Sequence, residues 1–567
     1  MSRRTMLDRI LATGARFHAS LISRAFFRAA MRAGAVQDRL LSTLLARAAG
    51  SEIGRRHDMA AIRGYDDFCR AIPIYNYERL APFIDRVRDG DTSALFSPNE
   101  SVLMFALTSG TTAEPKYIPI TPAALADYRR GWNIWGVKAI MDHPPSLLRG
   151  ILQVTSPMND HRSPGGVPCG AITGLLAATQ KKLVRRYYTS TPAVADIKDA
   201  KAKYYTIMRL AMPRDVSWAV TANPATLVLL ARTADEHRDA LIRDIRDGAL
   251  SDAVEVDGPI RDALRPRMTR DAEAARRLEA IVERHGGLYP KHVWRLDFLA
   301  HWTGGSMGLY RPQLRQYWGD APVRDIGLIA SEGRISIPIE DETPAGVAAI
   351  TSQFLEFIPE AEYERDDPTV LRSHEVREGE TYFVLLTNAS GLWRYDIGDR
   401  VRVTGRLGVA PLIEFLSRDA HSSSLTGEKL TEDQVVAAME AACRAQVTPS
   451  VDQFVLVPQW DDPPYYRLYV ESPVARARRD LAAAMDASLA AVNPEYAAKR
   501  QTLRLGPVRL CELTAGALLE RDRRLRRQKA RTAEQFKHQF LFSEPGLAQE
   551  RELHRYAVDA AASWAGD

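Results

Sequence analysis

LTSGTTAEPKYIPIT, residues Leu107–Thr121, is the stretch on which the interpretation of this chain depends. The apolar run Val102–Leu107 leads into it and predicts a buried strand, and Tyr117–Ile120 predicts a returning strand. Between them the chain places four hydroxyl side chains, one glycine and then one lysine: Thr108, Ser109, Gly110, Thr111, Thr112 and Lys116. Short hydroxyl donors, free backbone N–H groups and one ammonium favour a phosphate-binding loop.

This loop differs from a Walker A loop. Pro115 precedes Lys116, and no Gly-Lys-Ser/Thr start of a helix follows. A Ser/Thr-rich hairpin turn without a ligand stays open as the simpler alternative.

The composition describes a globular protein with more than one core. The chain has 567 residues, of which 46% are hydrophobic and 26% charged, and these values exclude a disordered chain. The net charge of +5 is small for this length, so no nucleic-acid partner is expected, whereas an anionic substrate is compatible with it. Lysine is scarce, with 12 among the 76 basic residues. This scarcity favours a specific role, rather than general surface solvation, for a lysine that lies within a motif.

Cysteine spacing and hydropathy predict a cytoplasmic protein with no transmembrane segment. Cys69, Cys169, Cys443 and Cys511 form no CxxC pair, which argues against structural zinc and disulfides. No run of about eighteen apolar residues occurs, and charges interrupt any signal-peptide core near the start. Residues 6–48 show helical periodicity, which fits either helices packed on the main domain or a membrane-surface helix.

The order of predicted elements indicates an α/β fold with two domains. Strands alternate with helices over about three hundred residues, so residues 1–416 are expected to form a large domain with layered, partly parallel sheets. Short strands after residue 350 predict antiparallel pairing and a small β-barrel-like part. A polar segment, 417–430, is the expected hinge, and 431–567 the smaller α+β domain, with a strand over 502–510.

Two further motifs place acidic side chains after predicted strands. In Asp325–Pro338, DIGLIASEGRISIP, a strand over Ile326–Ala330 is expected to end at Ser331 and Glu332. A carboxylate at the end of such a strand can hold Mg²⁺. In Gly391–Arg402, GLWRYDIGDRVR, a turn at Asn388–Gly391 leads to Tyr395 and then to Gly398 and Asp399. The Asp399 carboxylate can accept both hydroxyls of a ribose.

These motifs resemble those of adenylate-forming enzymes and, most closely, the GH3 family of acyl-acid amido synthetases. GEKLTEDQV, containing Lys429, and AEQFKHQFL, containing Lys537, resemble later GH3 segments, and the five elements occur in family order over about residues 50–545. In the first of these segments Thr431, followed by Asp433, predicts the N-cap of a helix. The resemblance implies that Ser331 contacts the nucleotide, Glu332 binds Mg²⁺ and Asp399 binds the ribose. It also implies a small domain that moves about a hinge near Arg418. Asp396 stands where many relatives have arginine.

The resemblance predicts an ATP-dependent ligase. The enzyme would activate a carboxylic acid as an acyl-adenylate, with ATP and Mg²⁺, and transfer it to an amino acid or another amine. Glu332, Lys429 and Lys537 are the expected catalytic residues. Two alternatives stay open: a thioester-forming ligase of the acyl-CoA type, and a non-catalytic relative that binds nucleotide or another ligand.

The acyl group is expected in an apolar pocket. Small and hydrophobic residues gather in two places, and the candidates are Ile172, Thr173, Gly174, Trp302 and Met307. An aromatic or medium-chain acid is predicted.

Overall fold

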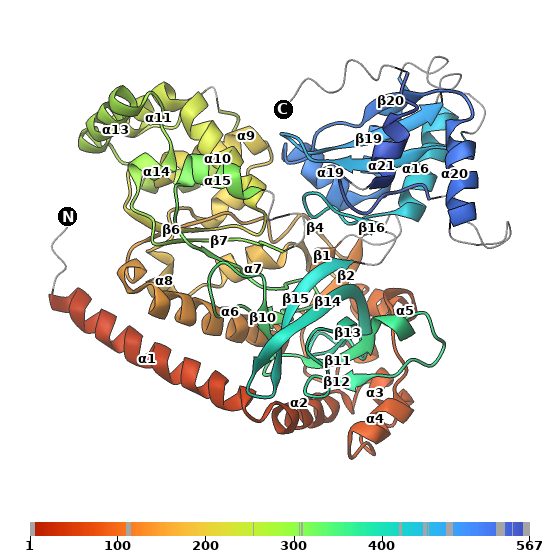
Figure 1. The fold of residues 1–567 in the computed structure, drawn as a ribbon. Helices are drawn as coiled ribbons and strands as arrows, with labels where there is room; N and C mark the ends of the chain where they lie inside the picture. The colour runs from red at the N-terminus through yellow and green to blue at the C-terminus, as the bar shows by residue number, and fades with distance from the viewer. Residues whose placement is uncertain are drawn as a thin grey trace. The chain divides into compact units, whose positions relative to one another are not determined.

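The structure is a computed structural model that describes residues 6–108, 115–252, 254–304, 307, 310–418, 422–445, 451, 453–471, 480–528, 539–546 and 548–558. The chain forms two compact units, coloured along the sequence in Figure 1. The first unit contains residues 1–107 and 117–416, and the second contains residues 108–116 and 417–567. The hinge over 417–430 stays a prediction.

A parallel sheet lies at the centre of the α/β part of the first unit. Its strands, in spatial order, are β3 (Gly150–Gln153), β6 (Val216–Val220), β7 (Phe298–Ala300) and β8 (Val323–Arg324). All three pairings are parallel, as the alternation of strands and helices predicts. Figure 1 shows helices α10 (Pro224–Glu236) and α15 (Arg311–Trp318) on one side of β6 and β7, and α6 (Pro122–Asp142) on the other.

A second sheet carries the strands on either side of the Ser/Thr-rich loop. Its order is β2 (Lys116–Ile120), β1 (Met104–Thr108), β5 (Pro168–Gly170) and β4 (His161–Arg162). The strands predicted before and after this loop are therefore confirmed.

The third sheet is antiparallel, as predicted. Its order is β12 (Leu371–Arg372), β11 (Phe354–Pro359), β13 (Thr381–Thr387), β14 (Tyr395–Leu407), β15 (Ala410–Arg418), β10 (Gly346–Ala348) and β9 (Ser336–Ile337). Among the described strands this order has two edges, β12 and β9, so a closed barrel is not formed.

The N-terminal helices are α1 (Met6–Ala30) and α2 (Ala33–Ala48). The buried Gln37 of α2 donates to the carbonyl oxygens of Ile350 and Gln353, each at 2.7 Å. It also accepts from the backbone N–H of Leu355 at 2.9 Å. These bonds fix α2 to the first unit. In the described part of the chain no helix has both the length and the apolar character that crossing a bilayer requires.

The remaining helices of the first unit are α3 (Glu52–Arg56), α4 (Tyr65–Ala71), α5 (Tyr77–Arg88), α7 (Ile172–Ala178), α8 (Lys182–Arg185), α9 (Ala200–Ala211), α11 (Arg238–Asp247), α12 (Gly258–Leu264), α13 (Ala272–His285) and α14 (Pro290–Val293). Short 3₁₀ turns are η1 (Thr92–Ala94), η2 (Pro144–Ser146), η3 (Pro192–Asp196), η4 (Arg265–Arg267) and η6 (Glu360–Glu362).

The second unit is α+β. Its three-stranded sheet has the order β18 (Val455–Gln459), β19 (Tyr465–Glu471) and β20 (Arg509–Leu513), and β16 (Ser422–Ser423) pairs with β17 (Leu430–Thr431). Its helices are α16 (Glu432–Ala445), α18 (Leu481–Val492), α19 (Pro494–Gln501), α20 (Ala517–Gln528) and α21 (Ala548–His554).

Two predicted strands differ from the structure. The strand expected over 502–510 begins only at Arg509, because the chain first folds back on the end of α19: Leu503 has φ +60°, and the backbone N–H groups of Arg504 and Leu505 both donate to the Lys499 carbonyl. The strand expected over Ile326–Ala330 is wrong, since β8 ends at Arg324. Gly327 has φ +87° and lies against the Ser336 carbonyl, so the chain turns where the apolar run predicts extension.

Helix α6 contains two glycines with different surroundings. A Cβ at Gly131 would lie 2.5 Å from Cδ of Arg334, whose guanidinium carbon is 4.6 Å from the Trp132 ring centroid. A Cβ at Gly136 would meet nothing within 4 Å. Gly131 therefore makes room for a buried arginine, and Gly136 has no such role.

We expect Gly131→Ala to lower the free energy of unfolding by about 1–3 kcal/mol, because overpacking must displace the Arg334 side chain. Gly136→Ala in the same helix should raise it by about 0.5–1 kcal/mol through helix propensity. Urea denaturation of the two variants measures both changes. Equal effects would contradict the packing of Arg334 on α6.

Candidate active site

The Asp325 carboxylate joins the loops that follow β7 and β8. It accepts from the backbone N–H and the hydroxyl of Thr303, at 2.6 and 2.7 Å, and from the backbone N–H of Gly327 at 2.6 Å. Burial raises the pKa of Asp325 to about 6, although these hydrogen bonds act in the opposite direction. Trp302 adds a bond from its indole N–H to the Gly327 carbonyl at 2.9 Å.

Ser331 and Glu332 lie at the tip of a tight turn. The backbone groups of Ala330 and Gly333 bond to each other in both directions, at 2.9 and 3.2 Å. The carbonyl of Ala330 accepts from the hydroxyl of Tyr128, and that of Glu332 accepts from the Asn388 amide at 2.7 Å. The turn is therefore held from α6 and from the loop before β14.

The Glu332 side chain is the chemically available group of this turn. It is 3% exposed. Among the described residues no hydrogen bond or ion pair to its carboxylate is found. The carboxylate lies near enough to Tyr128 that burial of the phenol and the charge of Glu332 together raise the pKa of Tyr128. Ser331 donates its hydroxyl hydrogen to the Leu107 carbonyl at 3.2 Å, at the end of β1. The structure thus brings Ser331 and Glu332 to the end of the strand that leads into the Ser/Thr-rich loop.

Arg334 supports the turn from within the core. It is fully buried and donates to the Ile326 carbonyl at 2.6 Å. Burial lowers the pKa of its guanidinium to about 9.

Asp399 lies in β14 and is 2% exposed. The preceding Gly398 has φ +69°, and its N–H bonds to the Asp396 carboxylate at 2.8 Å. Asp396 also accepts from the hydroxyl of Tyr363 at 2.7 Å. Asp396, which stands where the motif resemblance predicts arginine, therefore shapes an irregularity of β14 just before Asp399, where the pairing with β13 shifts register. The turn predicted at 388–391 is confirmed by Gly391, with φ +77°, and by its N–H bond to the Asn388 carbonyl at 3.3 Å.

Only part of the predicted phosphate loop lies within the described residues. Thr108 is the last residue of β1, and Lys116, buried, is the first of β2. Ser109, Gly110, Thr111 and Thr112 lie outside the described residues.

Lys429, in the second unit, follows an anchored glutamate. The Glu428 carboxylate accepts from the backbone N–H groups of Leu425 and Thr426, at 2.6 and 2.7 Å, and from the Tyr466 hydroxyl at 2.5 Å. Lys429 itself is half-buried with φ +49°, an uncommon backbone conformation outside glycine. Thr431 and Gln434 form a capping box at the start of α16, so the N-cap predicted at Thr431 is confirmed.

Two further predicted residues, beyond those of the phosphate loop, have no described side chain. Lys537 lies outside the described residues, and Arg418 is the last residue of β15, with its backbone alone described.

The predicted acyl residues fall in two places. Ile172, Thr173 and Gly174 open helix α7, and a Cβ at Gly174 would lie 2.5 Å from the Met158 backbone nitrogen. Met307 lines a cavity beside Thr303 that includes neither Trp302 nor the α7 residues.

Sequence reasoning missed four supporting residues: Tyr128, Thr303, Asn388 and Arg334. Asn388 precedes a turn signal and could have been suspected, whereas a helical tyrosine such as Tyr128 carries no signal of its contact 202 residues away.

Comparison with known families assigns the chain. The GH3 family N-terminal domain matches residues 23–323, its central domain 346–418 and its C-terminal domain 433–546. The chain belongs to the GH3 family of acyl-acid amido synthetases. GH3 amido synthetases are ATP-dependent ligases that form acyl-adenylates and amides.

Among similar proteins is a jasmonoyl–L-amino acid synthetase of Oryza sativa subsp. japonica, 26% identical, covering 86% of this chain and 89% of that protein. A jasmonoyl–L-amino acid synthetase of Nicotiana attenuata is 27% identical, and the match covers 73% of this chain and 74% of that protein. An indole-3-acetic acid-amido synthetase of Arabidopsis thaliana is 25% identical over 72% and 78%.

Solved structures share the fold. A GH3.15 acyl acid amido synthetase in complex with 2,4-DB aligns with a TM-score of 0.63 at 18% identity, over 94% of this chain and 96% of its own. A 2-hydroxyisobutyryl-CoA ligase aligns with a TM-score of 0.51 at 14% identity, over 93% and 92%. The mixed α/β, GH3-like fold predicted from the sequence is thereby confirmed.

Replacing Asp325 by asparagine should change how stability depends on pH. The folded-state pKa, about 6, exceeds the ordinary value of 3.8, so the folded protein holds this proton more tightly than the unfolded chain. The resulting stabilisation is complete below about pH 4 and is lost as pH rises through about 6. Two pKa units correspond to about 3 kcal/mol. We expect the wild type to lose stability relative to Asp325→Asn by up to that amount.

Urea denaturation across this pH range measures the difference between the two proteins. Asp252→Asn serves as a control because the Asp252 side chain is fully exposed. The difference in free energy of unfolding between this variant and the wild type should stay constant across the pH range. A constant difference for Asp325→Asn as well would show that this carboxyl titrates like a solvated one.

Proposed function

We propose that this protein is an ATP-dependent acyl-acid amido synthetase. It activates a carboxylic acid as an acyl-adenylate and transfers the acyl group to an amino acid or another amine. The observation that carries the proposal is the turn Ala330–Gly333, whose backbone is fixed while the Glu332 carboxylate stays available. Membership of the GH3 family indicates the class of reaction, and the geometry of this turn is compatible with that class.

The Glu332 carboxylate is suited to be a ligand of a Mg²⁺ ion that is bound together with ATP. Mg²⁺ prefers oxygen ligands and is usually held by one or two carboxylates, by substrate phosphates and by water. The described residues contain no cluster of three or more histidine, cysteine or acidic side chains that could hold a metal ion by themselves. Glu332 would therefore hold the ion with the nucleotide, and the ion would neutralise phosphate charge.

The other residues bind and orient the substrates. Thr108, Ser109, Gly110, Thr111, Thr112, Lys116, Ser331, Asp399 and Arg418 are proposed to bind the nucleotide. Asp399 would accept the ribose hydroxyls, and Ser331 would face the nucleotide beside Glu332. Lys429 and Lys537 would offset charge at the α-phosphate during adenylation, with a mobile second unit about a hinge at 417–430 excluding water from the acyl-adenylate.

The acceptor is proposed to be an amine rather than the thiol of CoA. The relatives at 25–27% identity are named as a jasmonoyl–L-amino acid synthetase and an indole-3-acetic acid-amido synthetase. The 2-hydroxyisobutyryl-CoA ligase, by contrast, shares only the fold. The four cysteines are free thiols, which is compatible with the cytoplasmic location that we propose.

The proposal is tested by a screen for pyrophosphate release from ATP and Mg²⁺ over carboxylic acids. We expect aromatic and medium-chain acids to be active. Product mass spectrometry with amino acids in one arm and CoA in the other distinguishes amide from thioester. Release by short polar acids alone would contradict the apolar acyl site, and thioester as the main product would contradict the amide assignment.

The same assay tests the role of Glu332. Glu332→Gln should lower the adenylation rate about a hundredfold, because the amide lacks the charge that holds the cation. Glu283→Gln, on the exposed face of α13, is the matched control and should behave like the wild type. Equal rates for both variants would remove Glu332 from the site.

Lys429 should matter to turnover as a point charge. Lys429→Ala should lower turnover about a hundredfold, and Lys429→Arg should not restore it, because a planar guanidinium differs in shape and hydration from an ammonium. Lys182→Ala, an exposed lysine, is the control. Adenylation and amide formation are measured separately, as pyrophosphate release and as single-turnover transfer from preformed acyl-adenylate. Normal turnover of Lys429→Ala would remove Lys429 from the proposed catalytic residues.

A further inference from the structure

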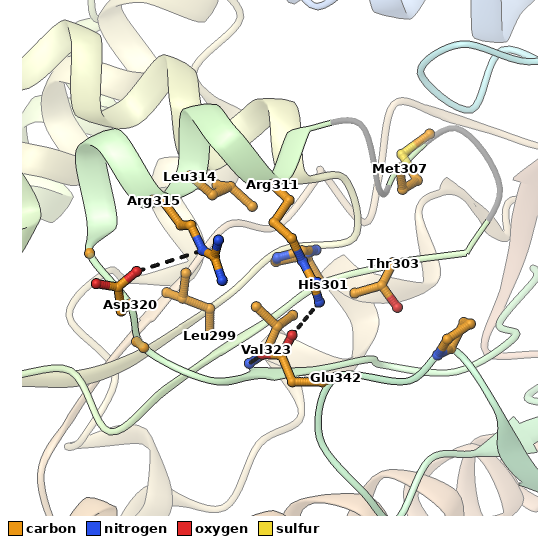
Figure 2. Close-up of a pocket in the computed structure, with 13 residues that line it drawn as sticks. Leu299, His301, Thr303, Met307, Arg311, Leu314, Arg315, Asp320, Val323 and Glu342 are labelled. Atoms are coloured by element: carbon orange, nitrogen blue, oxygen red, sulfur yellow. Dashed lines mark hydrogen bonds and ion pairs between the residues drawn. The ribbon is translucent and has the colours of Figure 1, made fainter.

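A cavity of about 260 Å³ lies between helix α15 and the strands β7 and β8. Figure 2 shows Arg311 and Arg315 reaching toward it from α15, with His301, Glu342 and Asp320 around them. Its apolar lining consists of Leu299, Met307, Leu314, Val323 and Pro344. We call it the His301 pocket. Its volume is below the range of about 300–1,000 Å³ found for drug-sized ligands, so it suits a small molecule.

The His301 pocket is on the other side of the sheet from α6. Phe298 stacks on Trp218 and on His143, with ring centroids 4.9 Å apart in both cases. Successive residues of a strand point to opposite faces, so Leu299 and His301 face α15 instead. Ser331 and Glu332 do not line this pocket, whereas Thr303, which bonds to Asp325, and Met307, one of the predicted acyl residues, do.

His301 presents an unsatisfied hydrogen-bond acceptor to this pocket. The side chain is 3% exposed, and its Nδ1 lies 2.7 Å from the Trp302 carbonyl oxygen, so Nδ1 carries the hydrogen. Burial lowers the pKa of His301 to about 4, which keeps the ring neutral near pH 7. Nε2 then offers a lone pair, and it is buried without a partner in the described structure. A ligand with an N–H or O–H donor would satisfy it.

Positively and negatively charged side chains lie close together around His301. Arg311 pairs with Glu342, whose other oxygen accepts from the Val323 backbone N–H at 2.8 Å. Arg315, one turn along α15, is 3.6 Å from Asp320, but their side chains are 64% and 90% exposed. Such an exposed pair is weak, so Arg315 can bind another carboxylate at little cost.

We propose that the His301 pocket binds a small zwitterion, namely a free α-amino acid with an apolar side chain. The ammonium has three donors, which suit His301 Nε2 and the Glu342 carboxylate. The carboxylate suits Arg315, and the side chain lies on the apolar lining. A simple anion would leave the acceptor at His301 unsatisfied, and a simple amine would leave Arg315 unused.

Isothermal titration of the full-length protein, without ATP or acyl acid, tests this proposal. The probes are leucine, N-acetyl-leucine, which lacks the ammonium, and 3-methylbutylamine, which lacks the carboxylate. We expect leucine to bind and each of the other two to bind at least about tenfold more weakly, because each loses a charge-assisted hydrogen bond. Equal binding of the three probes, or binding of none, would overturn the proposal.

Variants locate the binding. Arg315→Met, at an exposed position of α15, and His301→Phe should each weaken leucine binding about tenfold or more. Arg265→Met is the control, since Arg265 forms a similarly exposed pair with Asp262 outside the pocket. The surface variant keeps the test valid if His301→Phe does not fold. Leucine binding that survives Arg315→Met unchanged would place the amino acid elsewhere and refute the assignment.

Discussion

The hydrogen bonds to the Asp325 carboxylate are the constraint on which the first unit's site depends. They join Thr303, after β7, to Gly327, after β8, within a buried environment. Parallel strands end at one edge of a sheet, but their loops diverge unless something holds them. Here a single carboxylate with three donors holds both loops, and the turn that carries Ser331 and Glu332 begins five residues after it.

The rest of the site follows from that anchorage. With Gly327 fixed in the left-handed region, the chain returns as a hairpin whose tip is supported by Tyr128 from α6 and Asn388 from the loop before β14. The second unit uses a comparable device, in which the buried Glu428 carboxylate organises the backbone before Lys429. In both units one buried acidic side chain fixes the backbone, and a later residue carries the proposed chemistry: Glu332, seven residues after Asp325, and Lys429, directly after Glu428.

Much of this arrangement is predictable from local sequence. The strands around the Ser/Thr-rich loop, the antiparallel pairing after residue 350 and the cap at Thr431 follow from periodicity and turn chemistry. The strand over Ile326–Ala330 was not predictable as a turn, because an apolar run does not reveal that Gly327 lies against Ser336. The contacts of Tyr128 and Gln37 also carry no local signal, since their partners are some two hundred residues or more away and are set by packing.

The stacking of Arg334 on Trp132 gives the turn an optical label of its own. The guanidinium carbon lies 4.6 Å from the indole ring, and Arg334 follows Glu332 by two residues. An indole beside a cation changes its emission when the cation shifts. Trp132 fluorescence, isolated by comparison with a Trp132→Phe protein, would therefore report a shift of Arg334 in real time, without any attached dye.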